Sequence, residues 1–319
     1  MVDFLDFCVA ALLAFFDFLD AILHSFLPEW MIDFPEELFS VTDVFNGINT
    51  AVAWLTHTFS RFFDVITAGI RAPLVMVERF LYLLPWWLVI IAFAGVAWKI
   101  AGRRVALLPL IGLLFIGAMW LWDDTMTTLA IIVTAVAVSV LIGIPLGILA
   151  AKNDRCEAII RPLLDGMQTM PSFVYLIPAV FFFGLGKVPA VVATFIYAVP
   201  PCIRLTNLGI RQVAAEVVEA GTAFGSTSMQ LLFKIQLPLA RPSIMAGVNQ
   251  TIMMALAMVV ICSMIGASGL GIEVLRGLER LDIGRAFNAG ISIVVLAIMI
   301  DRVSQALGRA REVTRRPSA

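Results

Sequence analysis

The chain reads Glu219-Ala220-Gly221-Thr222-Ala223-Phe224-Gly225 and, after nine further residues, Ile235-Gln236-Leu237-Pro238. This stretch is polar and punctuated by glycine, and it lies between long apolar runs. A protein embedded in a membrane has little reason to keep such a segment outside the bilayer unless another protein docks on it. An ordinary helix–turn–helix between two membrane spans is the alternative.

The composition around this stretch is that of a membrane protein. Hydrophobic residues make up 61% of the 319 residues and charged residues 14%, and the mean hydropathy is +0.98. Soluble domains are about half apolar and about a quarter charged. The sequence therefore predicts an all-α polytopic membrane protein, with room for roughly six to eight helical spans of about 20 residues each.

The apolar runs and the charges between them predict an orientation. Lys and Arg are frequent after the first, third and fifth runs and at the C-terminal end, and basic loops stay on the cytoplasmic side. This pattern places the N-terminus outside, and both the C-terminus and residues 207–241 in the cytoplasm. About seven spans are predicted, at 83–98, 105–122, 127–150, 172–184, 188–206, 242–265 and 286–307.

The N-terminal region, residues 1–80, differs from the rest. Residues 1–60 hold nine of the 23 acidic residues and none of the 22 lysines and arginines. Helical periodicity predicts amphipathic helices over 1–27 and about 44–66, which lie in an interface or pack on a partner. The region either braces the rest of the protein at the outer surface or is a passive anchor. After it we expect peripheral transmembrane helices (81–124), the transmembrane core (125–308) and a cytoplasmic tail (309–319).

Several chemistries are disfavoured by what the predicted spans lack. Their interiors carry few ionisable side chains, whereas ion-coupled carriers need such groups to move charge. The sequence has no Gly-rich nucleotide-binding loop of the Gly-x-x-x-x-Gly-Lys-Ser/Thr type, and its four cysteines show no paired spacing. We therefore expect no metal site, no enzymatic activity, no cofactor bound by this chain and no nucleic-acid partner.

The residues of the polar stretch suit a short, rigid docking element. Glu216 or Glu219 near a helix start complements the positive end of the helix dipole, and Gly225 suits a left-handed C-cap or a tight turn. Pro238 and Pro242 are expected to stop a second short helix and redirect the chain into the next span. Three small residues would allow close approach of a partner and three apolar residues would pack on the core: Ala220, Gly221 and Ala223, and Leu231, Leu232 and Ile235.

The spacing of this stretch resembles the cytoplasmic EAA loop of ABC importer permeases, with Gly221 in place of the common second alanine. The resemblance covers about residues 125–307, and in 167–178, 197–204 and 265–271 it is similar to the glycine betaine/proline (quaternary amine) uptake permeases. It implies a type I ABC importer transmembrane fold with the coupling loop at 211–241. It also implies ATPase contact through Glu219, Ala220, Gly221, Ala223, Gly225, Ile235, Leu237 and Pro238.

The same resemblance implies partners and a function. The chain would be the permease subunit of an importer in the cytoplasmic (inner) membrane, moving glycine betaine or a related compatible solute (proline betaine, proline, choline). It would work with a second copy of itself, two ATPase subunits that bind ATP and Mg, and an external or periplasmic substrate-binding protein. The alternatives are a secondary carrier or channel for small amines, a membrane-embedded enzyme, and an ABC permease for another amine or amino acid, such as methionine.

Polar side chains within the spans are candidates for a substrate route. Proline-bearing spans such as 172–184 and 188–206 can break locally and expose backbone to a cavity. The candidates are Ser172, Tyr175, Tyr197, Asn249, Gln250, Thr251 and Ser263, with Thr134 and Ser139 as further polar positions; such side chains could instead bond a neighbouring helix. The glycine-rich turn with Gly266, Ser268, Gly269 and Gly271 is the candidate outer gate, with a plain surface loop as the alternative.

Overall fold

The computed structural model describes residues 41–309 and divides the chain into two units that meet between Thr58 and Phe59. Of the first unit, it describes α3 (Val41–Thr58), whose large apolar side chains are mostly exposed. The predicted helix 1–27 and nearly all of the tail 309–319 lie outside the described residues. The predicted helix 44–66 is wrong as a single element, because α3 ends at Thr58 and α4 (Ser60–Leu83) begins after the non-helical Phe59.

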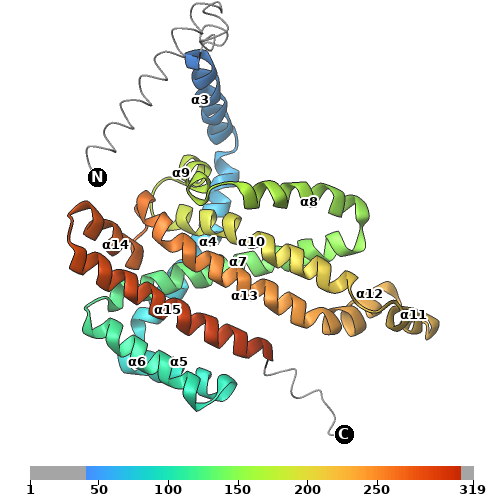
Figure 1. The fold of residues 1–319 in the computed structure, drawn as a ribbon. Coiled ribbons are helices and arrows are strands. Elements are labelled where there is room, and N and C mark those ends of the chain that lie inside the picture. The colour runs from blue at the N-terminus through green and yellow to red at the C-terminus, as the bar shows by residue number, and fades with distance from the viewer. Residues whose placement is uncertain (1–40, 310–319) are drawn as a thin grey trace, which may run out of the picture. The chain divides into compact units, whose positions relative to one another are not determined.

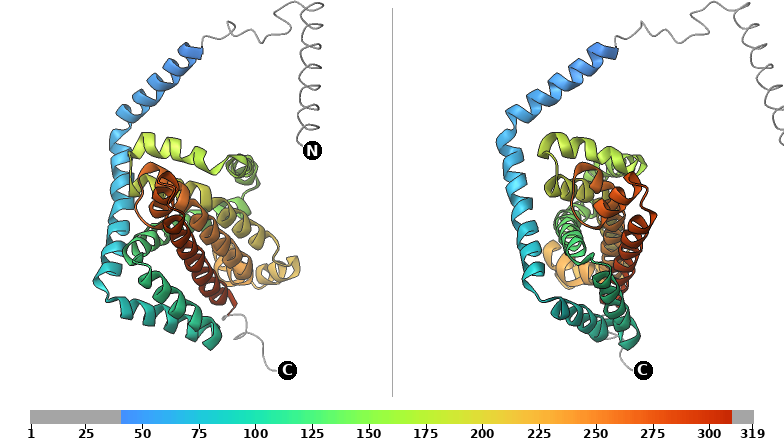
Figure 2. Two further views of the ribbon diagram at one scale, coloured as in Figure 1. Left: turned by 60° about the vertical axis from the view of Figure 1, so that its left-hand side comes forward. Right: turned by 90° about the vertical axis from the view of Figure 1, so that its left-hand side faces the viewer.

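The second unit begins with α4, which buries Ile70 and Leu74 against the core. It is bent by 106° from α5 (Trp86–Ala101). The cause is local, since Pro85 forces Leu84 into an extended conformation that a helix cannot continue. α5 and α6 (Arg103–Ala118) then fold back on each other (Figure 2). Each has 16 residues, or about 24 Å, which is less than the hydrocarbon thickness of about 30 Å.

Three long helices form the centre: α7 (Trp122–Lys152), α10 (Lys187–Arg211) and α13 (Leu237–Cys262). α10 packs against both of the others, and Figure 1 shows the three running side by side. Glycines permit this close packing, because a β-carbon at Gly147 would lie 2.8 Å from the Ile203 carbonyl oxygen and one at Gly209 would lie 2.7 Å from Ser243 Cβ. Small residues at helix crossings are how membrane helices approach closely.

Between α7 and α10 the chain forms α8 (Asp154–Thr169), a short 3₁₀ turn (Ser172–Tyr175) and α9 (Leu176–Phe183). α8 and the segment Ser172–Phe183 are bent by 113° relative to each other. As at Leu84, the bend lies at an extended residue, here Met170, which is followed by a proline. The run 172–184 is therefore too short to be a span by itself, and the sequence-based prediction missed α8. The predicted break in 188–206 is also wrong, because α10 continues through Pro200 and Pro201.

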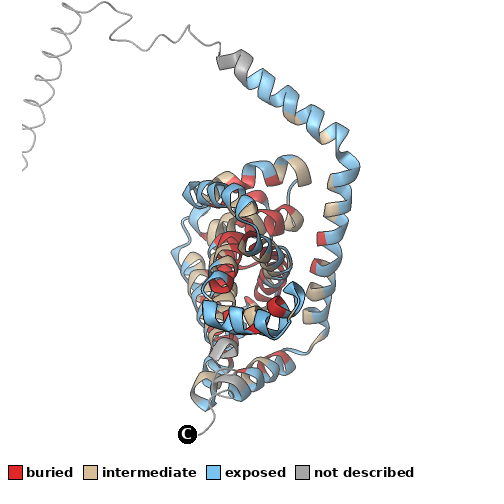
Figure 3. Cartoon of the chain, turned by 90° about the vertical axis from the view of Figure 1, so that its right-hand side faces the viewer, coloured by how far each residue is buried: buried red, intermediate tan, exposed pale blue. Residues whose placement is uncertain are grey.

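The unit ends with α14 (Leu270–Glu279) and α15 (Ile283–Arg309), which pack against each other, with α15 also contacting α5, α6 and α13. Figure 3 shows buried residues in the interior of the helix bundle. All regular structure in residues 41–309 is helical, which confirms the predicted all-α class. Within that range four helices are long and apolar enough to cross a membrane, or six if each bent pair is one span, so seven spans are not confirmed.

Candidate coupling surface and transport route

The polar stretch of the sequence forms a helical hairpin at one end of the central helices. α11 (Ala215–Ala223) follows α10, and α12 (Ser228–Leu231) leads through a π-helical turn (Leu232–Gln236) into α13. Figure 1 shows α11 and α12 together beyond the ends of α10 and α13. We call residues 215–231 the coupling segment.

The turn inside the coupling segment is fixed by backbone hydrogen bonds. Gly225 has φ +78°, its N–H donates to the Thr222 carbonyl at 2.9 Å, and the Ser226 N–H donates to the Gly221 carbonyl at 3.1 Å. This is a Schellman cap with glycine in the left-handed position, as predicted for Gly225. A capping box follows, in which Thr227 and Gln230 bond each other's backbone N–H groups. Two adjacent caps hold α11 and α12 at a defined angle.

The small residues of α11 divide between two roles. A β-carbon at Gly221 would lie 2.7 Å from Ile235 Cδ1 and 2.8 Å from Leu231 Cδ1, so Gly221 is an internal packing position. The expectation that Gly221 forms part of the docking surface is therefore wrong, while Ala220 and Ala223 are exposed. Leu231 and Leu232 are buried and Ile235 is half-buried, which confirms the predicted packing on the core.

The outward side of the coupling segment carries an exposed acid and exposed apolar side chains. Glu219 is exposed, and Phe224, the residue that follows α11, has 92% of its surface exposed. Val217 and Met229 are exposed as well. Exposed large apolar side chains on a polar, protruding element are typical of an interaction surface. We call Glu219, Ala220, Ala223 and Phe224 the coupling surface.

Pro238 and Pro242 do not stop the helix, contrary to prediction. The chain is helical without interruption from Ser228 to Ile265, with Leu237 and Pro238 in the first turn of α13 and Pro242 inside it. The π-helical turn just before Pro238 widens the backbone and accommodates the proline ring and its missing N–H. Because no loop separates α12 from α13, a movement of the coupling segment would pass directly to α13.

Two of the candidate route residues meet. The rings of Tyr175 and Tyr197 lie 5.8 Å apart at 62°, and the Tyr175 hydroxyl donates to the Met167 carbonyl. Tyr175 is buried in the core, whereas Ser172 at the start of the 3₁₀ turn is half-buried. The tyrosine pair serves packing in this arrangement, so its place on a substrate route stays a prediction.

The remaining route candidates lie on α7, on α13 and in the 3₁₀ turn Ser263–Ile265 that follows α13, and show mainly helix-to-helix or local bonds. Asn249 donates to Asp301 Oδ1 at 3.4 Å and accepts from Ser304 on α15. It therefore bonds a neighbouring helix, which was the alternative to a place on the substrate route. Gln250 is exposed, and Thr251 is buried with no hydrogen-bond partner for its hydroxyl among the described residues. Three hydroxyls bond the backbone of their own turn of helix: Thr134, Ser139 and Ser263.

The glycine-rich turn at the far end of α13 is firmly packed. Gly269 has φ +123°, and a β-carbon there would lie 2.5 Å from Thr128 Oγ1 on α7. That oxygen accepts the Leu270 N–H at 2.8 Å. A β-carbon at Gly271 would lie 2.7 Å from the Val259 carbonyl oxygen. Gly266 and Ser268 are exposed. The turn is thus a close junction with α7 and α13, and its role as an outer gate stays a prediction.

Sequence reasoning missed two ion clusters near this turn. Glu273 is 6% exposed and pairs with Arg276 at 2.7 Å and Arg285 at 2.6 Å; the Glu-x-x-Arg spacing in α14 is a signal that could have indicated it. Burial raises the pKa of the Glu273 carboxyl, but hydrogen bonds from the two arginines outweigh it and hold the pKa below its usual value. The second cluster joins Glu78 of α4 to Lys187 at the start of α10.

A third group of charges lies between α8 and α10. Arg161 and Asp165 of α8 and Arg204 of α10 line a cavity there. These residues and Glu78 lie on helices outside the predicted spans, except Arg204 of α10, and α8 and α4 each belong to a bent pair with the length and composition of a span. No group of three or more His, Cys, Asp or Glu side chains able to hold a metal ion occurs in the described part of the chain.

Comparison with known proteins places this arrangement in a family. The family model described as "Binding-protein-dependent transport system inner membrane component" matches residues 143–313. A solved structure of the MetNI methionine ABC transporter in inward-facing conformations has a TM-score of 0.54 at 23% identity, covering 62% of this chain and 99% of that chain. This match confirms the predicted transmembrane fold of an ABC importer permease.

Curated relatives agree over most of the chain. It is 46% identical over 296 residues to "Glycine betaine/proline betaine transport system permease protein ProW" of Escherichia coli (strain K12), with 88% of this chain and 82% of that protein covered. It is 50% identical over 258 residues to "Glycine betaine transport system permease protein OpuAB" of Bacillus subtilis (strain 168), with 81% and 92% covered. The chain therefore belongs to the family of binding-protein-dependent transport system inner membrane components.

Proposed function

We propose that the chain is the permease subunit of an ATP-driven importer that moves glycine betaine or a related compatible solute, such as proline betaine, proline or choline, into the cell. The names of the two relatives above support this substrate class. A third relative, "Glycine betaine/carnitine transport permease protein GbuB" of Listeria monocytogenes serotype 1/2a (strain 10403S), is 49% identical over 286 residues. The chain itself performs no bond chemistry, and ATP and Mg bind to the partner ATPase.

The coupling segment is the observation that carries this proposal. It is exposed, doubly capped and continuous with α13, as a part that transmits motion must be. Because each chain has one such segment, two copies of the chain with two ATPases form the simplest assembly. An external or periplasmic binding protein delivers the solute. The basic residues near the coupling segment and at the C-terminal end support an N-terminus outside and a C-terminus in the cytoplasm.

The continuity of α13 suggests how the motion reaches the far side. α13 has 26 residues and is about 39 Å long, so its two ends lie near opposite faces of a bilayer core of about 30 Å. In the proposed cycle, ATP binding brings the two coupling segments together and tilts α13. The tilt acts on the packed turn at Gly269 and Gly271 and opens the route outward. Hydrolysis reverses the motion and releases the solute inward.

Uptake of labelled glycine betaine into vesicles tests this function. The vesicles carry the full chain with its ATPase and binding protein, with and without internal ATP. Uptake that needs ATP and survives an ionophore supports an ABC importer, whereas uptake that ignores ATP and stops with the ionophore supports the secondary carrier. Competition by unlabelled proline betaine, proline, choline and methionine then ranks the substrates, and strong competition by methionine alone contradicts the proposed class.

A further inference from the structure

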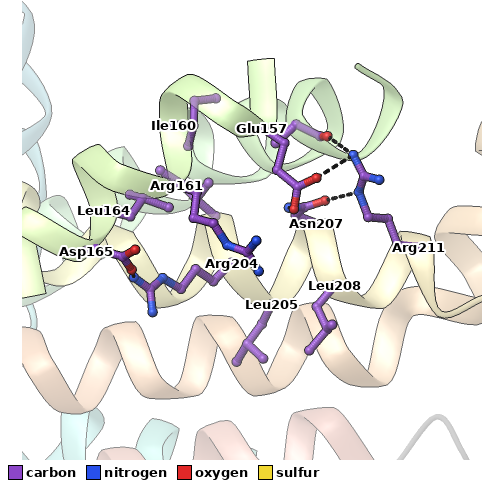
Figure 4. Close-up of a pocket in the computed structure, with 12 residues that line it drawn as sticks. Glu157, Ile160, Arg161, Leu164, Asp165, Arg204, Leu205, Asn207, Leu208 and Arg211 are labelled. Carbon is purple, nitrogen blue, oxygen red and sulfur yellow. Dashed lines mark hydrogen bonds and ion pairs between the residues drawn. The ribbon is translucent and has the colours of Figure 1, made fainter. Parts of the chain in front are cut away.

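A cavity of about 310 Å³ lies between α8 and α10, at the end of α10 that leads to the coupling segment. Figure 4 shows its charged residues on both helices, with the Arg161 side chain pointing from α8 toward α10. Three arginines and two carboxylates line it: Arg161, Arg204, Arg211, Glu157 and Asp165. The lining therefore carries one positive charge in excess.

The charges differ in how they are engaged. Arg211 bonds Glu157 at 2.8 Å and Asp154 at 2.7 Å, and Arg204 pairs with Asp165. Arg161 has no ion pair or hydrogen bond from its side chain to any described residue. Arg161 is an exposed residue that lines the cavity, and an unpaired guanidinium can receive an anionic group there because the planar donor fork of arginine matches a carboxylate.

The rest of the lining is apolar. Leu164 and Ile203 are buried at the cavity wall, and Leu208 is exposed. The carboxylate of Asp165 keeps 59% of its side-chain surface exposed although it is paired. The cavity thus offers a free cation, an accessible carboxylate and aliphatic surface close together.

The position of these charges favours a water-filled surrounding. α8 and the segment Ser172–Phe183 have together the length and composition of one bent span. Charges that face lipid at such depth are costly, and charged residues within spans face a bundle interior or an aqueous cavity and mark substrate pathways. A cavity lined by these charges fits an aqueous pathway better than a lipid-facing surface.

We propose that this cavity is a transient site for a small zwitterion that carries a carboxylate and a quaternary ammonium group. Arg161 binds the carboxylate, and the ammonium lies near Asp165 with its methyl groups against Leu164 and Leu208. A quaternary ammonium has no N–H to donate, so a nearby negative charge and apolar contacts are what can recognise it. The inference rests on the proposed function and adds to it a solute site within the permease.

The absence of aromatic side chains from the lining fits a transient site. Tight binding of quaternary ammonium uses aromatic cages, and no aromatic residue is among those that line this cavity. A site on a transport route must bind well enough to admit its solute and weakly enough to release it. One salt link with aliphatic contacts meets both conditions.

The first test compares Arg161→Gln with Arg161→Lys and with the control Arg155→Gln, an exposed arginine of the same helix that does not line the cavity. Uptake and ATP hydrolysis are measured in the same vesicles at saturating loaded binding protein. We expect Arg161→Gln to lower uptake about tenfold, as for loss of one charge-assisted hydrogen bond, with much less effect on ATP hydrolysis. Arg161→Lys should keep part of the uptake. Equal uptake by Arg161→Gln and Arg155→Gln overturns the site.

The second test separates this inference from the proposed function, because it needs no transport. Leu208→Cys is introduced in the full chain with Cys156→Ser, and its rate of modification by a charged thiol reagent is measured with and without glycine betaine. Protection at Leu208→Cys but not at the control Phe224→Cys supports the cavity site, even if vesicle uptake fails and the proposed function falls. Equal modification rates with and without glycine betaine overturn the site, even if the wild-type chain transports.

Discussion

Gly225 provides the sharpest prediction about the coupling segment, since only its backbone is constrained. Its φ is +78°, and a β-carbon there would meet nothing within 4 Å. A substitution therefore acts through backbone strain. Placing a non-glycine residue in the left-handed region costs roughly 1–2 kcal/mol, and asparagine tolerates it better than alanine.

Proline at this position differs in kind. Its φ is locked near −65°, so the backbone must rotate by about 140°. It also lacks the N–H that donates to the Thr222 carbonyl at 2.9 Å. We expect a local cost of about 3 kcal/mol or more, which is a factor of about 100 in the population of the capped turn. Gly225→Pro should thus uncouple transport from ATP hydrolysis while leaving membrane insertion intact.

The assay is uptake and ATP hydrolysis in vesicles that contain the complete transporter, with Ser226→Ala as the matched control. The expected order of uptake per ATP is wild type, Gly225→Asn, Gly225→Ala and then Gly225→Pro. If side-chain bulk against the ATPase were the cause, asparagine would be worse than alanine. That reversed order, or normal uptake by Gly225→Pro, would refute the argument from backbone conformation.

Substitutions at three further positions test the packing and one ion cluster, each read by thermal unfolding of the purified chain. Gly221→Ala should be nearly neutral, because a helix-propensity gain of about 0.5–1 kcal/mol offsets the displacement of the Ile235 side-chain tip. Gly221→Leu should lower the free energy of unfolding by about 1–3 kcal/mol. Equal unfolding midpoints for the two variants would count against the contact with Ile235. Gly269→Ala should lower the free energy of unfolding by about 1–3 kcal/mol, and the midpoint with it, through strain and collision with Thr128. An unchanged midpoint contradicts the tight junction. The arginines lower the pKa of the Glu273 carboxyl, so this group should stabilise the fold above its unfolded pKa and lose that contribution as pH falls through the lower folded pKa. Glu273→Gln should remove this part of the pH dependence of stability. An unchanged pH profile of the unfolding midpoint would contradict the prediction.

The turn inside the coupling segment could be predicted because its constraints are local. The left-handed Gly225 follows from the sequence spacing, and the Thr227–Gln230 capping box has a recognisable pattern as well. Gly221 was assigned to the wrong side of α11 because its neighbour Ile235 comes from another helix. Local spacing identifies a cap, but it does not show which face of a short helix meets the core.

Helix breaks show the limit of local signals. Pro85 and Pro171 follow extended residues and mark bends, whereas Pro200 and Pro201 lie inside α10 and Pro238 lies in the first turn of α13. The same residue type gives both outcomes, because packing on neighbouring helices decides whether a helix continues past it.

The sequence did not predict α8 as part of a membrane span because it carries charged residues. Arg161 and Asp165 interrupt the apolar pattern, and Asp165 is paired with Arg204 of α10, 39 residues later. Such pairing is tertiary information that no window of sequence contains. The proposed solute cavity lies between the same two helices, so local sequence could not predict it either.

The central claim is that the coupling surface connects the ATPase to transport, and Glu219→Lys tests it most directly. Glu219 is exposed and its side chain has no hydrogen-bond or ion-pair partner among the described residues, so reversing its charge leaves the fold intact. ATP-driven uptake of labelled glycine betaine is measured beside membrane insertion, with and without internal ATP. We predict normal insertion and loss of ATP-driven uptake; uptake equal to that of the wild type would contradict the account.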